Sequence, residues 1–270
     1  MLRNVQTLVD GRHFGFDPAR DGWIPHQYEE TKQYDTFYDF ESGWVVVDVG
    51  AWIGIWVIWV APFVKKIYAL EPVPEIINAL RQNVKLNGFT NVELFESAMF
   101  SKTGSAKMDV TGNPSASTLV DAWRHGAAWL YEGGRTITVQ TYRWDDWVTK
   151  NGIHKINLLK MDVEGAELDV LSGMSKVLPE RMAIAIYHLD SPLHALVEAL
   201  HEKGYVLEGF GYYDKNAPNK GKPHSGFFRH KNVPYETPRR YMMGKYELPT
   251  RELMNQGLPF YWESMGVKDD

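Results

Sequence analysis

The feature that most constrains the fold of this chain is an apolar run at residues 44–54 that one acid and two glycines interrupt. β-Branched residues lead up to Asp48, and Gly50 and Gly54 follow before a second apolar run begins. β-Branched side chains favour strands, and glycine allows the backbone of a tight turn. The run therefore predicts a buried strand that ends near Asp48, a tight turn and the start of a helix.

The same apolar stretch continues to residue 64 and is long enough to resemble a membrane-spanning helix. A membrane span would place the charge of Asp48 in the bilayer, which is costly, and Gly50, Gly54 and Pro62 would interrupt it. The strand–turn–helix interpretation explains every interruption. We therefore expect no membrane span.

Composition excludes several classes of protein. The chain has no cysteine, so disulfides, thiolate zinc sites and cysteine nucleophiles are ruled out. Residues 1–7 contain no apolar stretch typical of a secretory signal, and we expect a cytoplasmic protein. The formal net charge of −5 gives no overall basic field, so we expect no general nucleic-acid binding.

The length of 270 residues and the hydrophobic content of 44% suit one domain with extensions. Strands and helices are expected to alternate from residue 44 to about 210, which is typical of a layered α/β sheet. We predict an N-terminal extension at 1–43, a catalytic domain at 44–230 and a C-terminal extension at 231–270. Strands are expected at 44–49, 66–70, 92–95, 105–110, 136–140, 156–163, 182–188, 205–210 and 225–229, and helices at 27–40, 53–61, 74–86, 144–150, 166–171 and 192–203.

The glycine turn favours one nucleoside cofactor over another. A dinucleotide site usually has the pattern G-x-G-x-x-G, and its backbone N–H groups face a pyrophosphate. Here the middle glycine is absent and Asp48 would repel a pyrophosphate. S-adenosylmethionine carries a cationic sulfonium and an amino group, which a carboxylate attracts. The predicted cofactor contacts in this turn are Asp48, Gly50, Ala51, Trp52 and Gly54.

Two further strand ends extend this predicted cofactor site. Glu71 and Pro72 follow the second strand, and an acid there can accept hydrogen bonds from both ribose hydroxyls. Glu96, Ser97 and Ala98 follow the third strand and are predicted to meet the adenine edge. The carboxyl ends of parallel strands face one crevice, so all three segments are expected to contact one ligand.

Five blocks of the sequence carry a shared pattern. They are Val47–Ala51, Ala69–Pro72, Asn91–Val92 with Ala98 and Gly104, Thr141–Trp147 and Leu159–Glu167. These blocks resemble the FkbM family of S-adenosylmethionine-dependent methyltransferases. The resemblance spans roughly residues 44–210 and implies a class I methyltransferase fold: a Rossmann-like, seven-stranded, mostly parallel sheet with one antiparallel strand and helices on both faces. It also implies methylation of a hydroxyl on a glycan, polyketide or other small natural product.

Trp52 departs from the family pattern, which usually has an asparagine at this position of the turn. An indole cannot accept a hydrogen bond as an amide can. We expect it to pack over the cofactor or to line the entrance for the acceptor.

The most family-specific block contains the main candidate for the catalytic base. Lys160, Asp162 and Glu164 alternate along the end of the predicted fourth strand. Asp162 should lie in the crevice beside the methyl group and is our first candidate for the base or for an acceptor that orients the hydroxyl. Lys160 is a catalytic candidate, with a structural ion pair as the alternative. Glu164 and Glu167 can instead offset the dipole of the next helix.

His188 ends the predicted fifth strand and is the second candidate for the base, because imidazole accepts protons near neutral pH. His194 and His201 lie seven residues apart on the next helix, and that spacing is unlike helical metal-ligand pairs. A metal bound by Asp162, His188 and Asp190 is conceivable, but no pattern indicates it. We predict no metal site.

Recognition of the acceptor is expected to come from segments outside the resemblance blocks. Ser115, Ser117 and Trp123 lie in a long loop where aromatic rings can stack on a sugar or anchor a lid. Lys220, Lys222 and His224 are interpreted as a solvated turn, and Pro238–Tyr241 as a weak candidate for binding an anionic group.

Three alternatives to a small-molecule O-methyltransferase stay open at this stage. The first is an RNA ribose O-methyltransferase, which the acidic charge disfavours. The second is a non-catalytic scaffold of the same fold, which the presence of Asp48, Glu71 and Asp162 disfavours. The third, a dehydrogenase, is the weakest because its glycine pattern differs. Homo-oligomerisation is left open.

Overall fold

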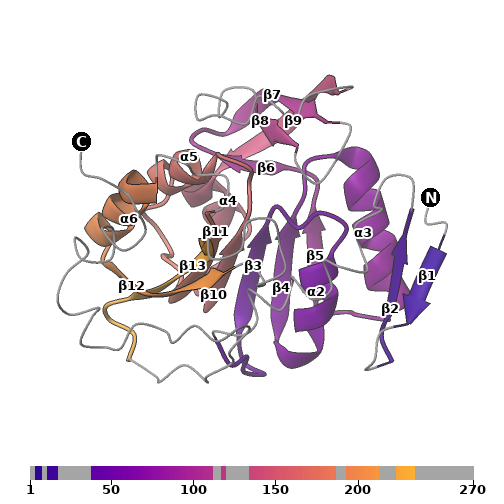
Figure 1. The fold of residues 1–270 in the computed structure, drawn as a ribbon, viewed down its shortest axis with the longest axis horizontal. Helices are drawn as coiled ribbons and strands as arrows, with labels where there is room; N and C mark the ends of the chain where they lie inside the picture. The colour runs from indigo at the N-terminus through magenta and orange to yellow at the C-terminus, as the bar shows by residue number, and fades with distance from the viewer. Residues whose placement is uncertain are drawn as a thin grey trace.

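The computed structural model describes residues 4–7, 11–17, 38–111, 117–119, 134–186, 193–212 and 223–234 (Figure 1). The helices are α2 (Ile55–Val60), α3 (Pro74–Leu86), α4 (Trp144–Lys150), α5 (Glu167–Ser172) and α6 (Leu193–Glu202), with a short 3₁₀ helix, η1 (Ala61–Phe63). The strands are β1 (Asn4–Thr7), β2 (His13–Phe16), β3 (Val45–Val49), β4 (Lys66–Leu70), β5 (Val92–Phe95), β6 (Ala98–Phe100), β7 (Gly104–Val110), β8 (Thr118–Leu119), β9 (Arg135–Arg143), β10 (Leu158–Met161), β11 (Arg181–Ala185), β12 (Tyr205–Tyr212) and β13 (Pro223–His230).

Seven strands form the central sheet in the order β12-β13-β11-β10-β3-β4-β5. The five strands from β11 to β5 are parallel to their neighbours in that group, whereas β13 runs antiparallel to both β11 and β12. A mostly parallel sheet of seven strands with one antiparallel strand is the predicted fold class. That prediction is confirmed.

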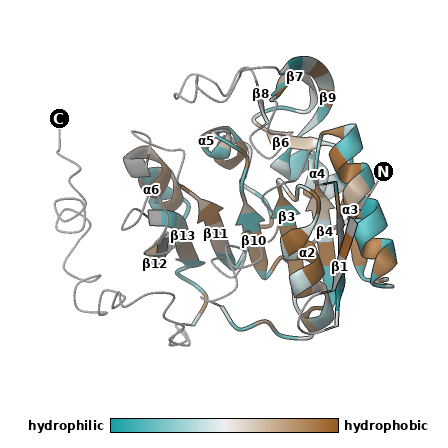
Figure 2. Cartoon of the chain, turned by 45° about the vertical axis from the view of Figure 1, so that its right-hand side comes forward, coloured by the Kyte–Doolittle hydropathy of each residue, from teal (hydrophilic) through white to brown (hydrophobic). Residues whose placement is uncertain are grey.

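Helices cover both faces of this sheet because successive strand residues point to opposite faces. On β3, Val46 joins a core with α2 and α3, while Val47 joins a second core with α4, α5 and α6. Leu158 and Leu159 divide in the same way on β10. Figure 2 shows the apolar strands between the two helical layers. The strands at the centre are therefore buried on both sides, as their continuous apolar sequence predicts.

Most elements lie where the sequence places them, and β4, α3, β5 and α4 have the predicted bounds. The predicted strand at 156–163 is wrong in length, since β10 ends at Met161 and the chain then turns. The helix predicted at 53–61 is shorter, since α2 spans Ile55–Val60 and Pro62 lies in η1. The larger part of the helix expected at 27–40 lies outside the described residues.

A second, smaller sheet with the order β6-β9-β7-β8 was not predicted as a unit. It lies at the top of the view in Figure 1, on the side toward which the arrows of β3 and β4 point. β6 follows β5 after only Glu96 and Ser97, so the small sheet begins at the carboxyl edge of the large one. This placement makes it a wall above the strand ends.

Part of the predicted N-terminal extension packs on the catalytic domain. β1 and β2 form an antiparallel hairpin, and β2 lies against α3. Asn83 on α3 is fully buried, and its amide accepts a hydrogen bond from Gly15 N at 2.7 Å and donates one to Gly15 O at 3.0 Å. The domain boundaries themselves stay a prediction. In the part of the chain that the structure describes, none of the helices has the length and apolar character needed to cross a membrane.

Candidate active site

The candidate active site lies where the carboxyl ends of β3, β4, β5 and β10 meet. Register places Asp48 beside Lys160 on one side and beside Ala69 on the other. The backbone N–H groups of Gly50 and Ala51 donate to Leu70 O at 3.1 and 3.0 Å. The glycine turn is thus fixed to the end of the neighbouring strand, as a ligand crevice of a parallel sheet requires.

Asp48 is a fully buried carboxylate, with 0% of its surface exposed. Lys160 Nζ lies 3.1 Å from Asp48 Oδ1, and neither oxygen of Asp48 accepts a hydrogen bond of normal geometry from the described residues. Burial raises the pKa of Asp48 to about 6, and Lys160 opposes that rise. A buried carboxylate that the surrounding chain leaves under-solvated is a strong candidate to meet a cationic ligand.

The turn that follows has left-handed backbone at three residues: Gly50, Trp52 and Gly54, with φ values of 79°, 47° and 90°. A Cβ added to Gly50 would lie 1.8 Å from the carbonyl oxygen of Asp162, and one added to Gly54 would lie 2.1 Å from Leu80 Cδ1. The sequence predicts that these glycines admit a cofactor. The structure shows that other parts of the chain also pack closely against both glycines, namely Asp162 against Gly50 and Leu80 against Gly54. The prediction named the cofactor alone and was therefore incomplete.

Glu71 at the end of β4 lies beside the same turn. Its Oε2 accepts a hydrogen bond from Trp52 N and its Oε1 accepts one from Val73 N, both at 3.0 Å. Burial raises the pKa of Glu71 to about 7, although both backbone donors lower it. The carboxylate therefore fixes the left-handed Trp52 and keeps further acceptor capacity for a ligand.

The residues after β5 divide between the surface and the interior. Glu96 is exposed, whereas Ser97 is 2% exposed and its hydroxyl has no hydrogen-bond partner among the described residues. Pro72, Ala51 and Ala98 are buried around the strand ends. Of the two polar side chains predicted near the adenine edge, Ser97 has the buried hydroxyl that could form a hydrogen bond with a ligand.

Asp162 lies directly after β10 and is half-buried. Its backbone N–H donates to Val49 O at 3.0 Å, and its carbonyl oxygen faces Gly50. The predicted extended chain through Glu164 is wrong, because Glu164 has a φ of 53° and Gly165 a φ of 100°. Asp162 and the glycine turn are thus adjacent, while Glu164 turns away from the strand direction.

Two neighbours hold the turn after β10. Thr118 Oγ1 on β8 donates to Glu164 O at 2.7 Å, which links the small sheet to this turn. Glu167 is fully buried, and its Oε1 accepts a hydrogen bond from Val163 N at 3.3 Å. Sequence reasoning missed Thr118, since a two-residue strand has no periodic signal. Glu167 therefore ties the first residue of α5 to the turn before it.

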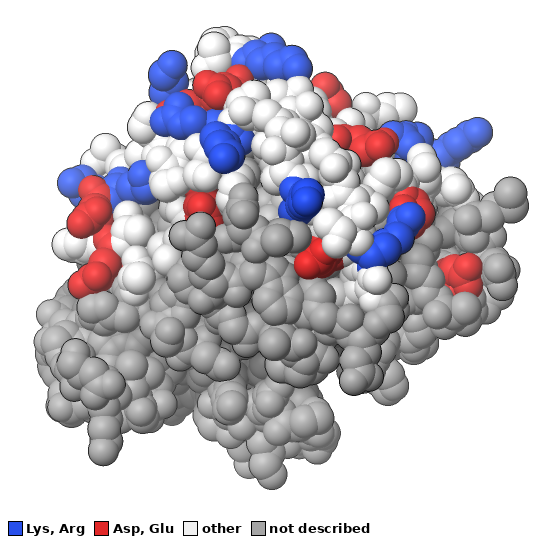
Figure 3. Space-filling view, turned by 90° about the horizontal axis from the view of Figure 1, so that it is seen from above, with Lys and Arg blue, Asp and Glu red and all other residues white. Residues whose placement is uncertain are grey.

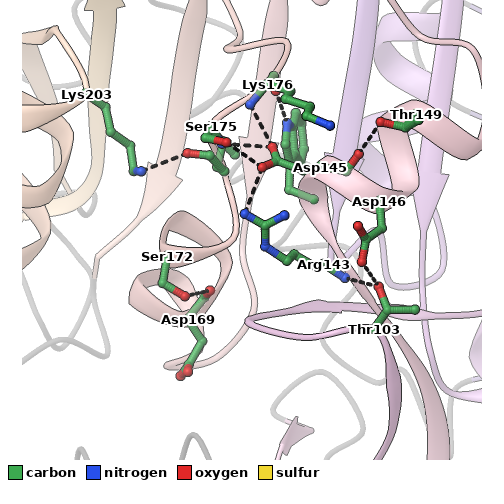
Figure 4. Close-up of polar contacts among 12 residues, drawn as sticks. Thr103, Arg143, Asp145, Asp146, Thr149, Asp169, Ser172, Ser175, Lys176 and Lys203 are labelled. Atoms are coloured by element: carbon green, nitrogen blue, oxygen red, sulfur yellow. Dashed lines mark hydrogen bonds and ion pairs between the residues drawn. The ribbon is translucent and has the colours of Figure 1, made fainter.

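The Thr141–Trp147 block is structural. The carboxylate of the buried Asp145 accepts hydrogen bonds from Ser175 N at 2.8 Å, Ser175 Oγ at 2.6 Å and Lys176 N at 2.7 Å, and it pairs with Arg143 at 2.8 Å. Figure 4 shows these contacts around Asp145, with the exposed Asp146 turned toward Thr103. Asp145 therefore fastens α4 to the segment after α5.

Several predicted residues lie outside the described residues, including His188, Asp190, Ser115, Trp123, Lys220, Lys222 and Pro238–Tyr241, and the side chain of His194 does too. Ser117 is buried beside β8. His224 is buried in β13, with its Nδ1 2.8 Å from Ser225 Oγ, so its assignment to a solvated turn was wrong. Among the described residues no three His, Asp or Glu side chains gather as metal ligands.

The strand order, with one antiparallel strand in a parallel sheet, is that of the class I methyltransferase fold. The chain belongs to the FkbM methyltransferase family, because the family model described as "Methyltransferase FkbM domain" matches residues 48–207. The expected class of enzyme, an S-adenosylmethionine-dependent methyltransferase, agrees with this membership and with the names of the relatives. The resemblance seen in the sequence is confirmed.

Individual relatives share modest identity with this chain. The methyltransferase sdnD of Sordaria araneosa is 29% identical over 193 residues, which are 60% of this chain and 73% of that protein. The 2-O-methyltransferase NoeI of Sinorhizobium fredii is 27% identical over 151 residues, which are 50% of this chain and 61% of that protein. The chain thus spans less than two thirds of the length of NoeI.

A solved structure supports the fold. The crystal structure of an FkbM methyltransferase from Methylobacillus flagellatus is similar, with a TM-score of 0.50 and 17% identity. The alignment covers 76% of this chain and 50% of that chain. At this identity the comparison bears on the fold alone.

Proposed function

We propose that this protein binds S-adenosylmethionine at the ends of β3, β4 and β5 and transfers its methyl group to a hydroxyl of a glycan, polyketide or other small natural product. One observation carries the proposal: Asp48 and Glu71 are buried carboxylates on neighbouring strand ends, and Lys160 is the cation that faces them. With Asp162 added, carboxylates outnumber that cation among the described residues of the site. A sulfonium and an ammonium group would restore the balance.

The residues present fit this cofactor in three respects. The under-solvated carboxylate of Asp48 suits the cationic aminoacyl end, and the spare acceptor sites of Glu71 suit ribose hydroxyls. The unsatisfied hydroxyl of Ser97 suits a polar edge of the adenine ring. S-adenosylmethionine supplies an activated methyl group when it is bound.

The transfer is an in-line displacement in which the sulfur–carbon bond breaks and an oxygen–carbon bond forms. The chain must orient the acceptor hydroxyl and take up its proton. Asp162 is our candidate for this task because it is half-buried and its main chain contacts the glycine turn. His188 stays the second candidate for the base.

A hydroxyl of a small molecule is favoured as the acceptor for two reasons. One relative is named a 2-O-methyltransferase. On the face in Figure 3, basic and acidic side chains of the described residues are interspersed, and neither sign forms a broad continuous patch. That distribution offers less to a polyanion than a basic stripe would, which disfavours the alternative of RNA ribose methylation. A cytoplasmic location stays a prediction, and homo-oligomerisation stays open.

Calorimetry with S-adenosylmethionine tests the cofactor, and transfer of tritiated methyl to a panel of glycans, polyketides, lipids and RNA tests the acceptor. We expect saturable binding and label in a hydroxyl compound. Asp162→Ala should retain binding of the cofactor and lose at least ~100-fold in kcat, and His188→Ala serves as the competing variant. Absence of binding in the intact protein would exclude the function, and the scaffold alternative would then be favoured.

A further inference from the structure

We propose that Lys160 is a positioning residue for the cofactor turn: it keeps the carboxylate of Asp48 ionised and fixes the carbonyl of Gly50, and it takes no part in proton transfer. The inference rests on the proposed function, since the ligand that Asp48 would meet is the cationic end of S-adenosylmethionine. It changes the assignment of Lys160 from a catalytic candidate to a group that acts through Asp48.

The geometry of Lys160 supports this role. Lys160 is 5% exposed and stands beside Asp48 in the parallel register of β10 and β3. Its Nζ lies 3.1 Å from Asp48 Oδ1 and donates a hydrogen bond to Gly50 O at 2.9 Å. One ammonium group therefore contacts both the acid at the end of the strand and the first residue of the turn.

The same contacts argue against Lys160 as a base. A base must be neutral before it accepts a proton. Burial acts to lower the pKa of Lys160, but Asp48, Asp162 and Glu71 outweigh burial, so the pKa is raised above its usual 10.5. The ammonium is therefore charged at neutral pH and has no lone pair to offer.

Asp48 depends on this charge because its carboxylate is fully buried. Among the described residues, the charged and titratable groups that face it are Lys160 from β10, Asp162 from the end of β10 and Glu71 from the end of β4. The two acids favour protonation of Asp48, and Lys160 is the group that opposes it. Without Lys160 the carboxylate would be neutral at pH 7 and would lose its attraction for a cation.

The test measures the dissociation constant of S-adenosylmethionine from pH 5.5 to 9 in the wild type, Lys160→Met, Asp48→Asn and the double variant. We expect Lys160→Met to weaken binding about tenfold or more at pH 7 and to recover much of that loss at pH 9. In the Asp48→Asn background, Lys160→Met should change the dissociation constant of S-adenosylmethionine only slightly. Lys160 also lowers the pKa of Glu71, and the Asp48→Asn background measures that second effect separately.

Two results would overturn the inference. One is a loss in Lys160→Met that is the same at every pH, which a purely structural role would give. The other is a large fall in kcat with unchanged KM for the cofactor, which a catalytic role would give. Lys160→Arg, which keeps the cation, should restore the wild-type pH profile. Lys160→Gln keeps a donor for Gly50 O without the charge and replaces the methionine variant if that one does not fold.

A titration of the ligand-free protein separates this inference from the proposed function. The ¹³C carboxyl resonance of Asp48 should titrate at higher pH in Lys160→Met than in the wild type. An unchanged titration overturns the inference whether or not the cofactor binds. A wild-type protein that binds no S-adenosylmethionine overturns the proposed function, and the titration still decides whether Lys160 governs the charge of Asp48.

Discussion

At the scale of a single residue, Gly50 shows how closely the glycine turn after β3 approaches the turn after β10 that bears Asp162. Its φ of 79° belongs to the left-handed region, and its missing Cβ is the space in which the Asp162 carbonyl lies. Trp52, two residues later, has left-handed backbone without the freedom of glycine. Glu71 accepts its N–H and helps to hold this conformation.

Gly50→Ala should therefore destabilise the protein strongly, because the methyl group would lie 1.8 Å from Asp162 O. We expect a loss of at least ~3 kcal/mol in the free energy of unfolding, measured by urea denaturation. Gly88→Ala is the matched control, since Gly88 also has positive φ, at 68°, but no atom within 4 Å of the added Cβ. A similar, small loss in both variants would contradict the close contact.

The raised pKa of Glu71 predicts that the stability of the protein depends on pH. Its pKa rises from 4.5 to about 7 on folding, so the folded protein holds this proton more tightly than the unfolded chain. The stabilisation is fully present below pH 4.5 and is lost as the pH rises through 7. Glu71→Gln should remove a decline on the order of 3 kcal/mol across this interval.

Unfolding in urea at a series of pH values measures that decline. The exposed Glu75 on α3 provides the control, and Glu75→Gln should leave the slope unchanged. If the free energy of unfolding declined equally with pH in Glu71→Gln and in the wild type, Glu71 would not be the group responsible for the decline.

At the scale of elements, the buried carboxylate of Asp145 links α4 to the segment after α5. Hydrogen bonds and Arg143 hold the pKa of Asp145 below its usual value despite burial. α4 has no side-chain cap of its own, and Trp144 Nε1 adds a second contact to the same segment by donating to Lys176 O at 3.0 Å.

Asp145→Ala should cost about 3 kcal/mol, because it leaves the N–H groups of Ser175 and Lys176 without their acceptor. Thermal unfolding measures the loss. The neighbouring Asp146 is exposed and accepts one hydrogen bond, from Thr103, so Asp146→Ala should cost less than ~1 kcal/mol. Equal losses in the two variants would contradict the role of Asp145.

The elements that the sequence predicts well are those whose pattern is local. α3 has apolar residues at helical spacing with Pro74 at its start, and β4 is a short apolar run between polar ends. The small sheet was missed because its order depends on pairing between distant strands, and β8 has only two residues. The strand predicted at 156–163 ran too far because its pattern continues past Met161, where Glu164 turns the chain.

The candidate site also contains features that the sequence predicts and features that depend on pairing between distant strands. Asp48 and Glu71 were predicted because parallel strands bring their carboxyl ends to one edge. The contact of Lys160 with Gly50 O and that of Thr118 with Glu164 O depend on register and on the small sheet. No spacing in the sequence encodes either contact.

At the scale of the whole molecule, the N-terminal hairpin contributes to the core of the domain. Besides Gly15, Asn83 also donates to Ile53 O at 2.9 Å, so one side chain joins β2, the glycine turn and α3. Arg12 donates to Ile58 O and Trp59 O at 2.8 and 2.6 Å. The hairpin thus supplies hydrogen-bond donors to backbone carbonyl groups near the end of α2.

Asn83→Ala should lower the free energy of unfolding by about 2–3 kcal/mol, because it leaves buried backbone groups of Gly15 and Ile53 unpaired. In a chain lacking residues 1–17 the same substitution should cost clearly less, since Gly15 is absent. Denaturation of the four proteins forms a double-mutant cycle. Strict additivity in this cycle would contradict coupling between the hairpin and α3.

The missing side chain of Gly50 has a consequence for anyone who wishes to redirect this enzyme. The loop proposed to bind the cofactor and the loop that bears Asp162 meet at Gly50, where an added Cβ would lie 1.8 Å from the Asp162 carbonyl oxygen. A substitution that moves either loop displaces the other, so apparent changes in acceptor choice near this contact will be accompanied by changes in cofactor affinity. Libraries that aim at the acceptor alone should therefore keep Gly50 and Asp162 constant and vary the small sheet.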